Sequence, residues 1–393
     1  MTPMGLGIGL GLADGGGSVS QSPSIVFANF TLPSSTGNFS ITTTDLGDRT
    51  PIGAFLWVSN GEVTDVTHNV GSEYGKHMTG MVDGTNQRAC YGAIVSGTSF
   101  DTRGWSNVAC LRLLSHITAS FVSFDENGMT MNFTELTAMS YGKMGFVMFV
   151  VGGDAACKVG DFTNFTVATP QTIDMGFASE AIFTSSALVP SSETSYNEDY
   201  IRWGFAVNDG VPSQYVANYN RTIGNGASEV HNDLCLSGAG SDGVTASFSG
   251  DDVTMTAVGG DFSSAMPYFA FTTGGKMKLK AGDLTSPVTT PGTVTETGLG
   301  ITPSIVLLLG GPNGGNWDTP YTSGYSVGFV QSGLQGSAGS FLGTGYGSTT
   351  GMWNNNLGKC TLDGVAFGEF TLDFTAVIGT AVRYPYIAFG ALS

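Results

Sequence analysis

Apolar and small polar residues alternate over short stretches along most of the chain. Examples are "ASFVSF" at 119–124, "GMTMNFTEL" at 128–136 and "GEFTLDFTAV" at 368–377. A period of two residues places one set of side chains on a buried face and the other set in water, as in a β-strand. Turn sequences such as "DENG", "NDG" and "SDG" fall between these stretches. One window, 106–117, has a tolerable helical period. The pattern predicts an all-β protein.

The same landmarks recur three times along the chain and in the same order. A glycine-centred strand is followed by a cysteine, and each copy closes on an apolar, aromatic strand. The glycines are Gly80, Gly204 and Gly328, the cysteines are Cys110, Cys235 and Cys360, and the closing strands read "GFVMFVV", "PYFAFTT" and "YPYIAFG". Landmarks that keep their order over three copies indicate tandem repeats of one structural unit.

The repeats predict three tandem β-sandwich modules of the jelly-roll or immunoglobulin-like class, with about seven to nine strands each. We place their boundaries at 41–166, 167–288 and 289–393, after a glycine-rich N-terminal segment at 1–40. The order of the strands within a module does not follow from the pattern alone.

A stretch with the frame "GGxxxxKxGD" occurs at 152–161 and again at 274–283. We interpret it as the exit from one module and the start of the linker to the next. In this interpretation Gly160 and Gly282 turn the chain, because glycine adopts backbone conformations closed to other residues. Lys158 and Lys280 are then charges that protect a sheet edge from unwanted pairing.

The composition is rich in glycine, with 59 residues, and only 11% of the chain is charged. The net charge of −17 repels a phosphate backbone, so nucleic acid is not expected as a partner. The opening "GLGIGLG" is too short to span a membrane, and no membrane insertion is expected. Three of the five cysteines occupy equivalent positions in separate modules, which predicts buried free thiols rather than disulfides.

No residue pattern in the chain matches a known catalytic or cofactor-binding signature. The stretch "TDVTHNVGSEYGKH" at 64–77 brings two histidines and two acids together, but a solvated hairpin loop explains it better than a metal site. Acidic turns such as the one at 125–127 fit ordinary turn chemistry better than calcium binding. A spatial pair of carboxylates for glycoside hydrolysis is a minor alternative. The sequence predicts no catalytic residue, no metal and no cofactor, and therefore not an enzyme.

The N-terminal segment reads as an extended strand with one glycyl edge and one apolar edge. Such a strand packs well against a sheet edge of another molecule. Its apolar residues are the candidates for anchoring the protein to a larger particle: Leu6, Ile8, Leu10 and Leu12.

The anchor "MGLGIGLGLADGGG" and the module frame "GLGITPSIVLLLGG … SVGFVQSG … YPYIAFG" resemble virion structural proteins of tailed bacteriophages. The similarity is to tail-appendage, fibre and head-fibre proteins with tandem β modules. It implies a non-enzymatic virion protein, made in the cytoplasm of the host bacterium. Its implied partners are other virion proteins, such as portal, tail or capsid subunits, and a glycan of the host surface. It also implies a homo-oligomer, with a trimer favoured.

The third module has the loops best suited to sugar, because aromatic rings stack on pyranose faces while amides and carboxylates bind hydroxyl groups. The candidate glycan-binding residues are Trp317, Asp318, Tyr321, Tyr346, Trp353 and Asn354. Two alternatives remain at this point. One is a decoration protein that stabilises a capsid or tail, and the less favoured one is a glycan depolymerase.

Overall fold

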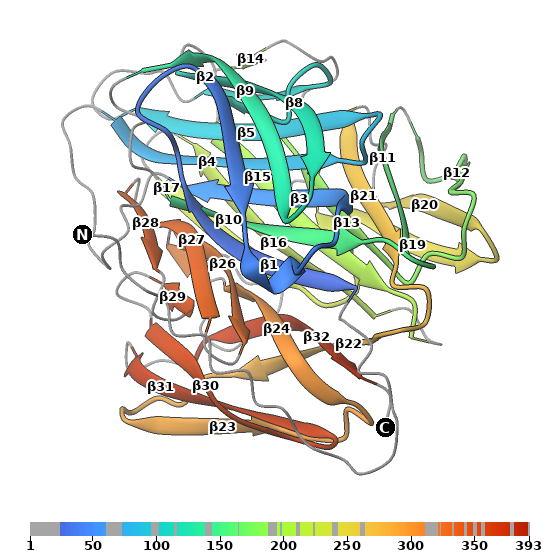
Figure 1. Cartoon of the computed structure of the whole chain (residues 1–393). Helices are drawn as coiled ribbons and strands as arrows, with labels where there is room; N and C mark the ends of the chain where they lie inside the picture. The colour runs from blue at the N-terminus through green and yellow to red at the C-terminus, as the bar shows by residue number, and fades with distance from the viewer. Residues whose placement is uncertain are drawn as a thin grey trace.

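A computed structural model of the chain shows an all-β protein (Figure 1). The structure describes residues 24–59, 73–95, 102–113, 116–137, 144–163, 165–187, 195–196, 199–209, 213–222, 225–237, 243–259, 264–310, 321–322, 324–331, 334–341, 344–348, 352–354, 358–377 and 381–391. One short 3-10 turn at Thr44–Leu46 is the only helical element in these ranges.

The strands form three modules with the same succession of elements, and the bounds of each strand follow. Module 1 contains β1 (Ile25–Thr31), β2 (Gly37–Thr42), β3 (Pro51–Ser59), β4 (Glu73–Val82), β5 (Gln87–Val95), β6 (Thr102–Ser106), β7 (Leu111–Leu113), β8 (Ile117–Asp125), β9 (Gly128–Leu136) and β10 (Met144–Val151). Module 2 contains β11 (Ala156–Phe162), β12 (Gln171–Asp174), β13 (Ala181–Ser186), β15 (Asp199–Val207), β16 (Ser213–Thr222), β17 (Asn225–His231), β18 (Leu236–Ser237), β19 (Gly243–Ser249), β20 (Asp252–Val258) and β21 (Met266–Thr272). Module 3 contains β22 (Lys278–Thr285), β23 (Gly292–Glu296), β24 (Thr302–Gly310), β26 (Gly324–Gln331), β27 (Leu334–Phe341), β28 (Thr344–Ser348), β29 (Met352–Asn354), β30 (Gly358–Ala366), β31 (Glu369–Val377) and β32 (Arg383–Ala391).

Each module builds one large and one small antiparallel sheet. In module 1 the large sheet has the order β1-β10-β3-β4-β5-β6 and the small sheet the order β2-β9-β8-β7. Modules 2 and 3 repeat both orders with their own strands. The first strand of a module therefore pairs with its last, while the strands in the middle follow one another as hairpins. The predicted all-β class is confirmed, and each module has more strands than the alternation indicated.

The large sheets are buried on both faces, as β10 shows. Every residue of this strand is buried. Phe146, Met148 and Val150 pack into a core shared between modules, whereas Val147 and Phe149 pack into the core of module 1 itself. A strand with two apolar surroundings needs a continuous apolar run rather than alternation. This explains why the closing strand of each repeat is apolar throughout.

The shared core joins all three modules into one body. It contains buried residues from the large sheet of every module. Phe27 of β1 stacks on Phe329 of β26 with ring centroids 4.7 Å apart, and Phe55 of β3 meets Phe183 of β13 at 5.3 Å. The small sheets lie on the outside, with β2-β9-β8, β19-β20 and β23-β31-β30 at different sides of the molecule (Figure 1).

The three modules close into a ring, because module 3 contacts module 1 as module 1 contacts module 2. At the first junction Arg88 Nε of β5 donates to Asp161 Oδ1 of β11 over 2.8 Å. At the closing junction Asn29 Nδ2 of β1 donates to the Gln335 carbonyl oxygen of β27 over 2.8 Å. Strands β5 and β27 hold the same place in their modules, as do β11 and β1. Strand β16 of module 2 likewise lies against β22 and β26 of module 3.

Two short strands cross from one module to the sheet of another. Strand β14 (Ser195–Tyr196), from the segment between β13 and β15, pairs with β6 of module 1. Strand β25 (Tyr321–Thr322), from the segment between β24 and β26, pairs with β17 of module 2. In both cases the next module extends the outer edge of the preceding sheet. Such additions protect an edge that otherwise offers unpaired backbone groups.

The strand pairing divides the chain earlier than the sequence predicted. The first strands β1, β11 and β22 begin at 25, 156 and 278, ahead of the predicted starts at 41, 167 and 289. The reason is physical: each first strand joins its module by pairing with a last strand more than a hundred residues away. A local pattern of residues carries no sign of that pairing.

The interpretation of the "GGxxxxKxGD" stretch was correct about module exit and wrong about its later glycines. Gly160 and Gly282 lie inside β11 and β22 and do not turn the chain. Each lies opposite a tyrosine of the paired strand, Tyr268 or Tyr386, and a Cβ at either position would collide with the phenol ring. These glycines make room for a buried ring.

The window with a tolerable helical period is not a helix. Its described residues, 106–113 and 116–117, include the end of β6, all of β7 and the start of β8. Tertiary pairing overrides the weak local preference here. The part of the chain that the structure describes contains no helix with the length and apolarity needed to cross a bilayer.

Candidate functional site

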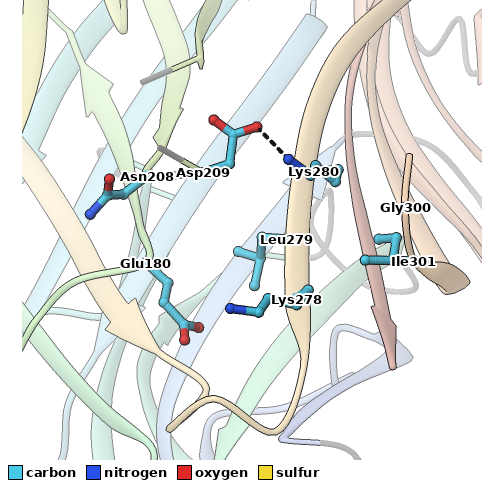
Figure 2. Close-up of a pocket in the computed structure, with 8 residues that line it drawn as sticks. All are labelled: Glu180, Asn208, Asp209, Lys278, Leu279, Lys280, Gly300 and Ile301. Carbon is cyan, nitrogen blue, oxygen red and sulfur yellow. Dashed lines mark hydrogen bonds and ion pairs between the residues drawn. The ribbon is translucent and has the colours of Figure 1, made fainter. Parts of the chain in front are cut away.

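A cavity of about 410 Å³ opens at the junction of modules 2 and 3 (Figure 2). Its lining combines two carboxylates, two lysines, one amide and a small apolar surface. Module 2 contributes Glu180, Asn208 and Asp209, and module 3 contributes Lys278, Leu279, Lys280, Gly300 and Ile301. A volume of this size falls within the range of about 300–1,000 Å³ typical of small-molecule sites.

Glu180 is held in place at the start of β13. Its backbone N–H donates to the Phe271 carbonyl oxygen over 3.0 Å, which extends the ladder between β13 and β21. Its Oε2 accepts from the Thr273 backbone N–H over 2.8 Å and from the Thr273 hydroxyl over 2.6 Å. The two hydrogen bonds to Oε2 fix the carboxylate, and Oε1 can accept from a donor in the cavity.

Asn208 and Asp209 follow the last residue of β15 and form the opposite side of the cavity. The Asn208 backbone N–H donates to the Glu180 carbonyl oxygen over 2.8 Å, so both residues are fixed to β13. Asp209 Oδ2 lies 3.3 Å from Lys280 Nζ, and this ion pair spans the two modules (Figure 2). The Lys280 side chain of this pair is 37% exposed and that of Asp209 14%, so water weakens its contribution to stability.

The alternation of β22 places its lysines around the cavity. Leu279 is buried in the shared core, so Lys278 and Lys280 on either side of it point the other way. The Lys278 amine points toward the Glu180 carboxylate in Figure 2. Each lysine therefore faces one carboxylate across the junction.

At the first junction apolar residues replace two of the charged residues of this cavity, although Arg88 and Asp161 form an ion pair nearby. In the repeated frame, Ala156 and Cys157 stand where module 3 has Lys278 and Leu279. Ile52 holds the place that Glu180 has in module 2. It precedes Gly53, which pairs with Val150, as Glu180 precedes Ala181, which pairs with Phe271. Ile52 packs against the shared core. Cys157 Sγ occupies the space that a Cβ on Gly53 would need. The equivalent places therefore hold apolar side chains at the first junction and charged side chains at the junction of modules 2 and 3.

The predicted site residues lie partly outside the described residues. Leu6, Ile8, Leu10 and Leu12 lie there, as do Trp317 and Asp318. The backbone of the other candidates is placed: Tyr321 lies in β25, Tyr346 in β28, and Trp353 and Asn354 in β29. Strands β28 and β29 are neighbours, whereas β25 lies on the sheet of module 2. The structure thus brings the strands of Tyr346 and Trp353 together and puts Tyr321 on another sheet.

The structure describes only the end of the cluster at 64–77, where Glu73 and His77 lie in β4 rather than in the expected solvated loop. His77 lies within β4 and is buried, with its ring 5.5 Å from that of Trp203 in module 2. Burial lowers the pKa of His77 to about 3, so the ring is neutral at ordinary pH. Asp65 and His68 lie outside the described residues. Within the described ranges, no group of three or more histidine, cysteine and acidic residues is arranged to hold a metal ion.

The five cysteines are free, as predicted, and all except the half-buried Cys157 are fully buried. Burial raises the pKa of Cys110 and Cys235 to about 12. Each of these two thiols donates over 3.3 Å to a carbonyl oxygen, of Ala119 and Val244 respectively. Thiols in such surroundings are structural and unreactive.

A second group of carboxylates lies in module 3. Tyr386 Oη donates to Glu296 Oε1 over 3.1 Å, and burial raises the pKa of Glu296. Asp283 accepts from Arg383 over 2.7 Å. An acid of raised pKa near a second carboxylate has the chemical character that glycosidases use. Here each carboxylate is engaged by a partner from its own module, which gives both a structural role.

Comparison of the chain with models of known protein families and with curated proteins finds no match. The cavity thus has to be interpreted from its own chemistry. Sequence reasoning missed it, because Lys280 was interpreted as an edge charge and Asp209 as part of a turn. The available signal was the exchange of Ala156 for Lys278 within an otherwise repeated frame.

Proposed function

We propose that the chain is a non-enzymatic structural protein of a bacteriophage particle. In this proposal the N-terminal segment attaches it to other virion proteins, and the β modules are displayed for attachment to a glycan of the host surface. The resemblance of the sequence to tailed-phage appendage proteins suggests this role. A homo-oligomer of the whole chain, and a trimer in particular, stays a prediction.

The observation that supports the proposal best is the shared core. Three modules that could each fold around a separate core instead bury one face of every large sheet against the others. Contacts such as Phe27 with Phe329 and Phe55 with Phe183 leave no hinge between modules. A body of this kind holds its outward segments at fixed spacing, which suits a protein that displays binding surfaces under mechanical load.

The outer faces of the small sheets support the same role. Each carries an equivalent pair of hydroxyl groups, directly opposite each other on paired strands. The pairs are Ser40 with Thr130 at 2.8 Å, Thr172 with Thr254 at 2.8 Å, and Thr295 with Thr371 at 2.9 Å. Polar, uncharged faces of this kind keep a particle surface soluble without large apolar patches.

Immunogold labelling of particles from the source lysate tests the proposal. Gold on the tail or on projecting fibres is expected, while gold spread evenly over the head would favour the alternative of a decoration protein. The absence of gold from every particle would refute a virion role. The matched variant lacks residues 1–23, because a longer deletion would remove β1 from its sheet. This variant should fold and fail to enter particles.

Attachment to cells is tested separately from particle assembly. Changing Trp317 and Trp353 to alanine in the full chain should abolish binding of the purified protein to host cells if the loops of module 3 hold the glycan. Unchanged binding by the folded double variant would exclude these loops as the receptor site. A polysaccharide that shortens on incubation with the wild-type protein would instead support the depolymerase alternative.

A further inference from the structure

We propose that the cavity between modules 2 and 3 is a binding site for a neutral hexose unit of a saccharide. This inference deepens the proposed function, on which it rests, by naming a site and a ligand chemistry for surface attachment. It adds a site distinct from the loops of module 3 that the sequence pointed to.

The polar groups of the cavity match the hydroxyl groups of a sugar ring. The Glu180 carboxylate is oriented by two bonds from Thr273 to one of its oxygens, so its second oxygen is a fixed acceptor. The Asn208 amide donates to the Ser179 carbonyl oxygen over 3.4 Å, and its second N–H and its oxygen remain to bind a hydroxyl group. The Lys278 amine points across the gap. Fixed acceptors beside flexible donors suit vicinal hydroxyls, which donate and accept at once.

The apolar part of the lining matches the remaining surface of a hexose. Leu279 and Ile301 are the two buried aliphatic residues of the lining. Gly300, with φ of +65°, has no atom near the place of a missing Cβ and leaves that side open. A pyranose has C–H faces that contact such surfaces while its hydroxyls bind the rim. The volume of about 410 Å³ accepts one such ring with water around it.

The charge balance favours a neutral ligand over an acidic one. Two lysines and two carboxylates line the cavity, and Lys280 is already paired with Asp209. No excess positive charge is left for a carboxylate or sulfate on the ligand. The net charge of −17 on the chain repels anions further.

Comparison with the other two described junctions indicates that this cavity is specific to the junction of modules 2 and 3. At the first junction Ile52, Gly53 and Cys157 fill the equivalent place. At the closing junction Asn29 and Gln335 bond directly. Joining the modules does not require these charges, because Ala156 and Ile52 serve at the equivalent places of the first junction, and a partly exposed ion pair contributes little to stability.

Saturation-transfer NMR on the purified full chain tests the inference. The probes are methyl glucoside, methyl galactoside and N-acetylglucosamine at millimolar concentration, with glucuronate as the acidic comparison. We expect transfer to at least one neutral sugar. In Asn208→Trp, which fills the cavity from its exposed rim, and in Lys278→Glu, which places like charges opposite each other, affinity should fall about tenfold or more.

The matched control is Ala156→Glu, which introduces the same acidic side chain at the equivalent position of the first junction. It should bind sugar as the wild type does, and circular dichroism should show all three variants folded. Transfer to none of the neutral sugars, transfer to glucuronate alone, or unchanged binding in both cavity variants would overturn the inference.

The two proposals fail in distinguishable ways. Gold-labelled particles together with no sugar binding would remove the cavity site and leave the virion role. Sugar binding that depends on Asn208 and Lys278, with no particle labelled, would keep the site and remove the virion role.

Discussion

The glycines at the centres of β4 and β15 lie against the backbone of the opposite sheet of the same module. A Cβ on Gly80 would overlap the Cys110 carbonyl oxygen, and a Cβ on Gly204 would overlap the Cys235 carbonyl oxygen. In modules 1 and 2 the glycine and the cysteine that mark the repeat in the sequence are therefore two sides of one contact. Because backbone atoms cannot swing aside as side chains do, the contact tolerates no larger residue.

Replacing Gly204 with alanine should destabilise the protein by about 1–3 kcal/mol or more, the range for overpacking a core. The free energy of unfolding in urea measures this. Gly364→Ala is the control, since nothing lies near its missing Cβ. Equal stability of the two variants would contradict the contact described for Gly204.

The buried His77 should make the protein less stable in acid. Its pKa is lowered from 6.5 to about 3 by burial, so between these values the unfolded chain binds a proton that the folded chain does not. Stability is therefore lost as the pH falls from about 6.5 toward 3, by up to about 1.4 kcal/mol per pH unit.

Urea unfolding of the wild type and of His77→Gln at several pH values between 7 and 4 checks this prediction. The variant should lose less free energy of unfolding over that interval than the wild type. Parallel pH profiles for the two proteins would show that His77 takes up its proton without unfolding.

Single residues also mark the limit of sequence reasoning about the site. The exchange of Ala156 for Lys278 is visible in the repeat. The role of Lys280, however, depends on its ion pair with Asp209, which lies 71 positions away. Glu180 gains its fixed orientation from Thr273, 93 positions away. The sequence contains these groups without showing that they meet, because their approach is set by the pairing of β13 with β21 and by the packing of module 3 against module 2.

At the level of elements, the alternation and the turns predicted the strands of the sandwiches well. The short strands β14 and β25 escaped prediction because two residues show no period. The long-range pairing of β1 with β10 escaped it as well, and with it the module boundaries. Elements defined by a partner rather than by their own sequence are the ones that local patterns miss.

Tyr196→Pro should release β14 from the edge of module 1, since proline cannot donate to a ladder and distorts a strand. Hydrogen exchange at β6 should become faster, with little change in global stability. Tyr321→Pro is the reciprocal control, and it should affect β17 instead. Exchange at β6 that is equally fast in both variants, or unchanged in Tyr196→Pro, would speak against an edge-protecting role.

For the whole molecule, the shared core predicts that the three modules unfold together. Phe329 of module 3 is fully buried and lies 4.7 Å from Phe27 and 5.3 Å from Phe146 of module 1, measured between ring centroids. Phe329→Ala should cost about 3–5 kcal/mol. Calorimetry should show a single transition in the wild type and a single, lower transition in the variant.

Phe39→Ala is the comparison, because Phe39 is only partly buried and packs within module 1 against Phe133. It should lower the transition temperature less. A Phe329→Ala profile in which one transition moves while another stays would show that the modules are independent. In that case the ring would be an assembly of separate units rather than one folding unit.

The covalent continuity of the ring has an evolutionary consequence. If three identical subunits formed such a ring, every substitution would appear at all three junctions, and a charged residue that improved one contact would have to suit the other two. With the three units in a single chain, each junction is free to diverge on its own. The pairing of Asp209 with Lys280 at one junction, beside Arg88 with Asp161 at another and Asn29 with Gln335 at the third, records that freedom. Duplication within one gene allows one junction to diverge while the other two keep the ring closed.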